Sequence, residues 1–228
     1  MQLKPVLAAA VTALAALSAH AAAVNLNGYT VNYDETTSGF GTVSFTFGDG
    51  TNEGFGWKVS NTVGVVSAGQ GLQMASFDMP SFTITAKPGF TLSGITGFLG
   101  NLVFNEVSTG ASTSASASGD LAVNGVPAGM FGGILTKNTT FSAGTYNSGY
   151  HAIQGSMGTP SYNMLSFSGG FLTLTASAGA GQFASVIGNP QNTLSFSVVP
   201  TPVPEPETFA LMLAGLVAIG SLARRQQG

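Results

Sequence analysis

Residues 171–175 read Phe171-Leu172-Thr173-Leu174-Thr175, so that leucines alternate with threonines. Successive side chains of a β-strand point to opposite faces, and this stretch therefore predicts a strand with one apolar and one polar face. The same alternation recurs at 24–27, 43–47, 82–85 and 194–198. Weaker versions of the pattern lie at 56–66, 102–107, 134–141 and 165–167. Several short strands are therefore expected along the middle of the chain.

Short turn-forming sequences separate these segments: Gly48-Asp49-Gly50, Lys87-Pro88-Gly89, Asn124-Gly125, Gly169-Gly170 and Gly188-Asn189-Pro190. Glycine, proline, asparagine and aspartate supply the backbone conformations that a chain reversal needs. Many short strands with such punctuation predict an all-β domain over residues 24–199, an antiparallel β-sandwich or jelly roll. We expect no helix in that part of the chain.

Residues 109–119 read Thr-Gly-Ala-Ser-Thr-Ser-Ala-Ser-Ala-Ser-Gly and contain no large side chain. Low-complexity sequence of this kind predicts a flexible loop between two halves of the sandwich. The alternative interpretation is an edge strand of small and polar residues, because alanine and serine alternate there.

Charged residues make up only 7% of the 228 residues, against about 25% in a typical soluble domain. Between residues 24 and 200 there are three lysines and seven acidic residues, so no basic patch is available to neutralise phosphates. Nucleic-acid binding is therefore not expected. The sequence also contains no cysteine, which excludes disulfides, thiolate nucleophiles and thiolate metal sites.

The N-terminus has the three parts of a secretory signal peptide: a basic start at Lys4, an apolar run over residues 6–17 and a small-residue end. We expect residues 1–23 to be this segment, removed by signal peptidase. The A-x-A pattern allows cleavage after Ala21 or after Ala23. An amphipathic first helix is the alternative, but the apolar residues form an unbroken run and not a stripe.

The last 26 residues combine a Pro-Glu-Pro motif, an apolar run over 209–223 and the pair Arg224 and Arg225. A helix over 208–223 would be about 24 Å long at ~1.5 Å per residue, short of the ~30 Å hydrocarbon core. The positive-inside rule places the basic tail, 224–228, in the cytoplasm, where the arginines stop transfer and snorkel. Residues 200–207 are rich in proline and predict an extended spacer.

This tail resembles the PEP-CTERM sorting signal of Gram-negative bacteria, with Val203, Pro204, Glu205 and Pro206 as its motif. The resemblance implies transient anchoring in the inner membrane and cleavage near the motif by an exosortase, a membrane-embedded protease. It also implies delivery to the cell surface or extracellular matrix and an association with exopolysaccharide and biofilm. A plain single-helix membrane anchor is the alternative interpretation.

Few residues of the middle domain suit catalysis. His151 is the one histidine beyond the signal segment, and no Gly-x-Ser-x-Gly, phosphate-binding loop or His-Glu-x-x-His sequence occurs. We therefore expect a non-catalytic structural or adhesive protein with no cofactor. The alternatives are a secreted glycan hydrolase, which would use a pair of carboxylates, and a calcium-dependent carbohydrate-binding module.

The calcium alternative depends on the loop over residues 48–54, in which Asp49, Asn52 and Glu53 offer oxygen ligands. An ordinary turn with solvated acids is the other interpretation, because Asp, Asn and Gly are common turn residues. For glycan binding, six aromatic residues are candidates for a sugar-stacking platform: Tyr29, Tyr33, Trp57, Tyr146, Tyr150 and Tyr162. Aromatic residues also dominate ordinary cores, so core packing is the alternative.

Overall fold

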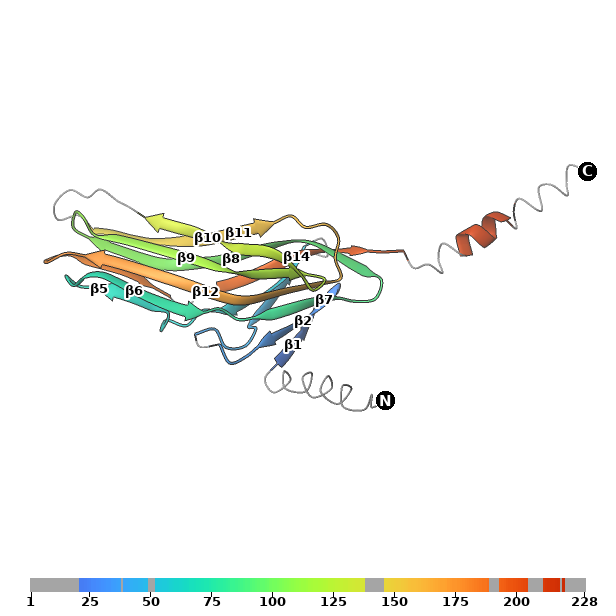
Figure 1. The fold of residues 1–228 in the computed structure, drawn as a ribbon, viewed down its shortest axis with the longest axis horizontal. Helices are drawn as coiled ribbons and strands as arrows, with labels where there is room; N and C mark the ends of the chain where they lie inside the picture. Colours follow the sequence, from blue (N-terminus) through green and yellow to red (C-terminus); the bar gives the residue numbers. More distant parts are fainter. Residues whose placement is uncertain are drawn as a thin grey trace, which may run out of the picture.

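The computed structural model describes residues 21–37, 39–48, 52–137, 146–188, 193–204, 211–217 and 219, and it consists almost entirely of β-strands (Figure 1). The strands are β1 (Ala21–Asn25), β2 (Tyr29–Asp34), β3 (Phe45–Gly48), β4 (Glu53–Lys58), β5 (Gly64–Ser67), β6 (Gly71–Asp78), β7 (Phe82–Ala86), β8 (Phe90–Val107), β9 (Ser112–Val123), β10 (Val126–Lys137), β11 (Tyr146–Met157), β12 (Met164–Ala178), β13 (Phe183–Ile187) and β14 (Thr193–Pro202). Every pairing between them is antiparallel. The predicted all-β antiparallel class is thus confirmed.

The strands form two seven-stranded sheets that pack face to face. The first sheet has the order β1-β2-β7-β12-β9-β10, and β6 also pairs with β12. The second has the order β3-β4-β14-β8-β13-β5, and β11 pairs with the other edge of β8. β10 and β11 end their sheets on the same side of the sandwich (Figure 1).

One long strand organises each sheet. β12 pairs on one edge with β7 and then β6, and on the other edge with β9. β8 does the same with β14 and then β13 on one edge and β11 on the other. Register shifts in both long strands, such as the one between Ser168 and Phe171, bend them so that they can serve two partners in succession.

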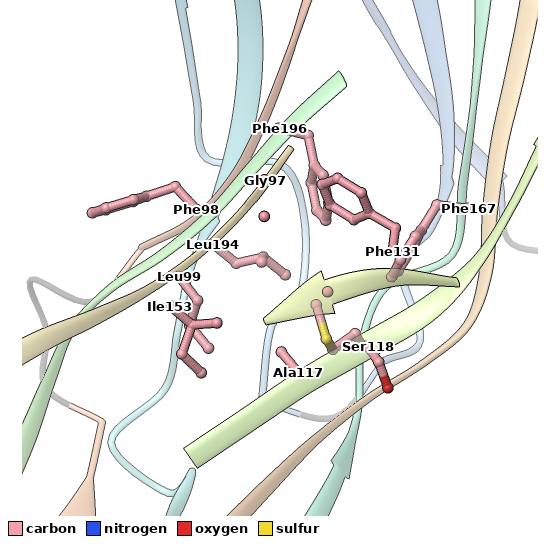
Figure 2. A pocket seen from close by; sticks show the side chains of 13 residues that line it. Gly97, Phe98, Leu99, Ala117, Ser118, Phe131, Ile153, Phe167, Leu194 and Phe196 are labelled. Carbon is pink, nitrogen blue, oxygen red and sulfur yellow. The ribbon is translucent and has the colours of Figure 1, made fainter. Parts of the chain in front are cut away.

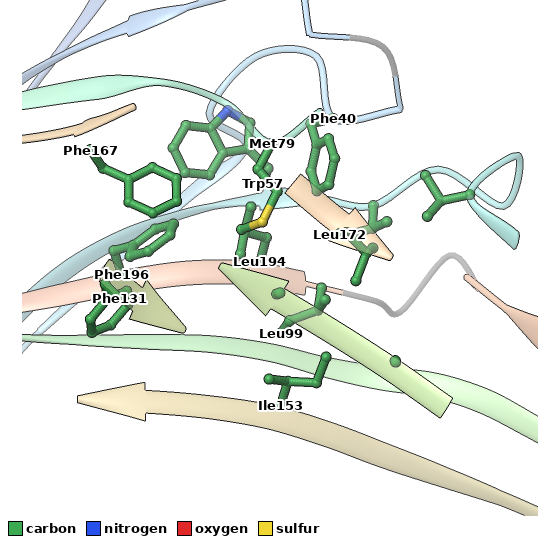
Figure 3. Packing of buried hydrophobic residues seen from close by; sticks show 14 of the residues in the cluster. Phe40, Trp57, Met79, Leu99, Phe131, Ile153, Phe167, Leu172, Leu194 and Phe196 are labelled. Carbon is green, nitrogen blue, oxygen red and sulfur yellow. The ribbon is translucent and has the colours of Figure 1, made fainter. Parts of the chain in front are cut away.

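Aromatic rings from both sheets fill the core (Figure 3). Phe196 of β14 is central: its ring centroid lies 4.6 Å from that of Phe82 and 5.3 Å from that of Phe167 in the opposite sheet. Trp57 of β4 is fully buried, and its ring centroid lies 6.3 Å from that of Phe196. Edge-to-face and offset pairs of this kind stabilise a core by about 0.5–1.5 kcal/mol beyond their burial.

Residues 109–119 do not form the predicted flexible loop. From Ser112 they belong to β9, which lies between β12 and β10 and is therefore an interior strand, not the edge strand of the alternative interpretation. Ala115 and Ala117 point inward and are buried, and a Cβ on Gly119 would lie 2.3 Å from Cζ of Phe167. Small residues are required here because large side chains of β12 occupy the space.

The second sheet continues into the segment that was predicted to be a spacer. β14 reaches Pro202, and the backbone N–H of Val203 donates to the carbonyl of Gly89 at 2.8 Å. Proline is tolerated there because the pairing of β14 with β4 ends at Val198, which leaves one edge of β14 without a neighbouring strand among the described residues. The sorting motif therefore begins where the sheet ends.

Residues 211–217 and 219 are helical. They belong to the predicted helix over 208–223, whose remaining residues lie outside the described part of the chain. No helix within the described residues has the length and apolar character needed to cross a membrane.

Candidate functional site

Glu53, one of the calcium candidates, is held inside the fold at the start of β4. Its side chain is only 3% exposed, and its Oε2 accepts a hydrogen bond from the Gly28 N–H at 3.1 Å. Its carbonyl accepts a hydrogen bond from the Tyr29 hydroxyl at 2.8 Å. Asn52 is exposed, and Asp49 lies outside the described residues. In the part of the chain that is described, no three His, Cys, Asp or Glu side chains converge as a metal site would require.

A second buried acid, Glu106 of β8, is also hydrogen-bonded within the fold. Its Oε1 accepts a hydrogen bond from the Thr113 hydroxyl at 2.6 Å. A carboxylate is costly to bury without such partners, so both Glu53 and Glu106 have a clear structural role. A hydrolase would instead need acids that reach a glycan in solvent.

Exposed acids line one open cleft of the first sheet. Asp34 and Asp78 border it together with Gly169 and Gly170, at the register shift of β12, and its volume is about 440 Å³. Asp34 Oδ1 accepts hydrogen bonds from the backbone N–H and the hydroxyl of Thr36, at 2.8 and 2.6 Å. Asp34 thus stabilises the turn that follows β2.

For the four candidates whose side chains are described, the sugar-stacking interpretation is wrong and the alternative of core packing is confirmed. Tyr29, Tyr33, Trp57 and Tyr162 are all buried in the core. The Tyr162 hydroxyl donates to the carbonyl of Gly94 at 2.6 Å. Burial raises the pKa of both Tyr29 and Tyr162 well above the usual range, and the nearby Glu53 raises that of Tyr29 further. These tyrosines are neutral anchors of the core.

Three other candidates belong to β11. Its backbone includes Tyr146, Tyr150 and His151, paired with Val107, Val103 and Leu102 of β8. Their side chains lie outside the described part of the structure.

Among the described side chains of the second sheet, the aromatic residues that reach the outer face are phenylalanines that the sequence analysis did not select. Phe45 and Phe47 of β3 lie stacked, with ring centroids 6.1 Å apart and planes inclined by 26°. Phe98 of β8 lies on the same outer face and points away from the core (Figure 2). Phe47 is 42% exposed and Phe98 38% exposed. The signal was present in residues 53–57, Glu-Gly-Phe-Gly-Trp, where alternate glycines leave one face of β4 bare.

The outer face of the first sheet is covered by hydroxyl groups. Ser114 and Thr175 are hydrogen-bonded across β9 and β12, and Ser76 and Thr173 across β6 and β12, the latter at 3.1 Å. Ser112, Ser116, Ser118 and Ser177 continue these rows. Such groups both donate and accept hydrogen bonds, so the face suits a hydroxyl-rich partner.

An apolar cavity between the two sheets is too small for a glycan. Its volume is about 30 Å³, and it lies beside β10 and β11 (Figure 2). Phe131, Ile153 and Leu194 are among the residues that line it. A space of this size holds a few water molecules at most.

The processing sites at both ends adjoin strands of the sandwich. Ala21 and Ala23 belong to β1 and pair with Asp34 and Asn32 of β2. At the other end Val203 and Pro204 are described and exposed. Glu205, Pro206, Arg224 and Arg225 lie outside the described residues.

A family model described as the PEP-CTERM protein-sorting motif matches residues 202–226. The resemblance of the tail is thereby confirmed, and the chain carries this motif. The motif indicates export and membrane-associated sorting by exosortase-type machinery. No curated protein matches the chain.

Some solved structures resemble the chain weakly. Structures of the Gx and Gt strains of infectious bursal disease virus are 14% and 13% identical, cover 83% and 87% of this chain, and give TM-scores of 0.19 and 0.17. The chain spans about half of each of those chains, 50% and 55%. A structure from work on promiscuous carbohydrate-binding modules of the β-sandwich superfamily is 10% identical, with 74% of this chain and 95% of that chain covered and a TM-score of 0.18. Similarity this low supports no conclusion about fold or function.

Proposed function

We propose that this protein, with its PEP-CTERM sorting motif, is a non-catalytic adhesive or structural component of the cell surface or extracellular matrix that associates with exopolysaccharide. The observation that carries the proposal is the chemistry of the two outer faces. Rows of serine and threonine hydroxyls cover the outer face of the first sheet, and polar residues such as Ser195 and Thr96 accompany the exposed phenylalanines on that of the second. Hydroxyl groups that donate and accept match those of a polysaccharide.

The proposed route begins with signal peptidase and passes through the inner membrane. The C-terminal segment holds the chain there until an exosortase cleaves near residues 203–206. Because the last strand, β14, ends at Pro202 and Val203 is hydrogen-bonded to Gly89, cleavage near residues 203–206 leaves every described strand in the product. Such a product keeps both outer faces available for adhesion.

We expect signal peptidase to cleave after Ala21 and not after Ala23. Cleavage after Ala21 keeps four of the five residues of β1, including Ala22 and Val24, which pack against the core. Cleavage after Ala23 would leave only Val24 and Asn25 to pair with β2. N-terminal sequencing of the exported protein should therefore read Ala22 first. A first residue of Val24 would contradict this expectation.

Co-sedimentation of the full chain with neutral and uronate-rich exopolysaccharides tests the proposed function. We expect saturable binding to at least one of them, without release of reducing ends. The control for catalysis is the pair Asp34→Asn and Asp78→Asn, because these acids border the open cleft. Release of reducing ends that either substitution abolishes would establish a hydrolase and refute the proposal.

A further inference from the structure

We infer that the outer face of the second sheet binds a single chain of a neutral polysaccharide. The inference rests on the proposed function and assigns its binding site. The aromatic face, as we call this surface, consists of two rows that cross five strands, β3, β4, β14, β8 and β11. They are Phe45–Gly56–Ser195–Phe98–Gln154 and Phe47–Gly54–Ser197–Thr96–Ser156.

Glycines make the three rings lie flat on the sheet. A Cβ on Gly54 would lie 2.2 Å from Cζ of Phe47, and one on Gly56 would lie 2.4 Å from Cζ of Phe45. A Cβ on Gly100 would lie 2.2 Å from Cε1 of Phe98. Each ring therefore occupies the space of a missing side chain and presents its other side to solvent. A flat ring face is the surface on which the C–H groups of a sugar ring can pack.

Polar side chains accompany the two aromatic positions, which are Phe45 with Phe47 on β3 and Phe98 on β8. Ser195 alternates along β14 with the buried Leu194 and Phe196 and so points to the outer face, whereas Ser197 in the second row is itself only 8% exposed. Thr96 lies beside Phe98 on β8, and Gln154 and Ser156 of β11 extend the two rows beyond β8. Their hydroxyl and amide groups can hydrogen-bond the edges of a sugar ring while its face packs on phenylalanine.

The spacing of the rings suits an extended chain. β3 and β8 are separated by three strand-to-strand intervals, or about 14 Å at ~4.8 Å per interval. This length accommodates a short oligosaccharide lying across the strands. A monosaccharide would contact only one of the two aromatic positions.

The two rows of the aromatic face are uncharged, which favours a neutral ligand. Neither row contains an acidic or basic residue, and Lys58, in the neighbouring row, is the nearest cationic position along the strand pairing. A polyuronate would need cationic partners, which the rows do not offer. Another protein is a poorer match, because Ser195 interrupts the apolar surface between the phenylalanines of β3 and Phe98 and divides it into small patches.

Binding of the full chain to soluble hydroxyethylcellulose, with polygalacturonate for comparison, tests the inference. We expect Phe47→Ala and Phe98→Ala each to weaken binding to hydroxyethylcellulose by about tenfold, since a stacked aromatic contact is worth roughly 1.4 kcal/mol. Phe47→Leu keeps an apolar side chain over Gly54 but lacks a ring. It should therefore weaken binding to hydroxyethylcellulose as much as Phe47→Ala does. Phe47→Tyr keeps the ring and should bind as the unmodified chain does.

Phe171→Ala makes the same change on the outer face of the first sheet, where Phe171 is 44% exposed and pairs with Ser118 of the hydroxyl rows. We expect it to leave binding to hydroxyethylcellulose unchanged, and a loss of binding in this variant instead would place the site on the first sheet. The melting temperature of every variant shows that it is folded. If the unmodified chain binds but the Phe47 and Phe98 variants bind equally well, the aromatic face is not the site, although the proposed function stands. If the unmodified chain binds only polygalacturonate, the neutral ligand is wrong. If it binds no polysaccharide, the proposed function itself fails.

Discussion

Replacement of Phe196 by alanine is expected to lower the free energy of unfolding by about 3–5 kcal/mol, the usual cost of removing a fully buried phenylalanine. The ring of Phe196 is in contact with five others, and they come from both sheets: Phe55, Trp57, Phe82, Phe131 and Phe167. The surrounding rings are themselves packed against one another, so they cannot move far to fill the cavity. A domain with a stability of about 5–15 kcal/mol would lose a large part of it.

Urea unfolding followed by fluorescence measures this effect directly. Trp57 is the single tryptophan and lies 6.3 Å, centroid to centroid, from Phe196. Phe171→Ala is the matched control, since an exposed phenylalanine should change stability by no more than about 0.5 kcal/mol. The contradicting result is that Phe196→Ala lowers the free energy of unfolding by less than about 1 kcal/mol while the slope of that free energy against urea concentration stays unchanged. That result would show that the two sheets are not packed through this ring.

Deletion of residues 204–206 is expected to abolish C-terminal processing almost completely. The sandwich ends at Val203, so the deletion removes the motif without removing any residue of a strand. We expect the variant to accumulate as uncut precursor in the inner-membrane fraction. An immunoblot of membrane, surface and medium fractions measures this distribution.

Single substitutions make the test more specific. Glu205→Ala changes the acidic residue of the motif, and Glu207→Ala makes the same change two residues further along. We expect the first to block processing and the second to leave it intact. Normal processing of Glu205→Ala and of the deletion would refute the assigned role of the motif.

Strands were predicted best from the sequence where apolar and polar residues alternate along the chain without interruption. Residues 82–85, 171–175 and 194–198 lie within β7, β12 and β14. In β8, three glycines and a register shift break the alternation, so that only its last part, 102–107, was predicted. A long strand that serves two partners in succession has no simple periodicity, because the bend moves its side chains from one face to the other.

Residues 109–119 show a different limit of sequence reasoning. Alanine and serine occur both in cores and on surfaces, so these residue types say little about burial. Whether the segment is an interior strand depends on the side chains that pack against it. Only the position of Phe167 of β12, over Gly119 of β9, makes small residues necessary in an interior strand. That contact joins residues far apart in the chain and cannot be read from either segment alone.

For a related reason, the sequence could not decide which aromatic residues are buried and which lie on an outer face. Tryptophan and tyrosine suit sugar stacking as residue types, but Trp57 and Tyr29 point into the sandwich and Phe45 and Phe47 point out of it. The face of a strand follows from its register. The glycines opposite Phe45 and Phe47 mark the outer face only once the pairing of β3 with β4 is known.

The sorting motif, in contrast, was predicted from the sequence alone. A processing enzyme recognises a short linear segment, so that the order of residues 203–206, an apolar run and Arg224 and Arg225 is sufficient. The structure added that β14 carries the chain to the first residue of this motif.

The intact mass of the protein recovered from outside the cell tests the central claim most directly, namely that a complete β-sandwich is exported and released by processing at both ends. We predict a chain that begins at Ala22 and lacks the apolar run and Arg224 and Arg225. Recovery of the chain only from the cell, or outside it with the whole C-terminal segment retained, would contradict the claim.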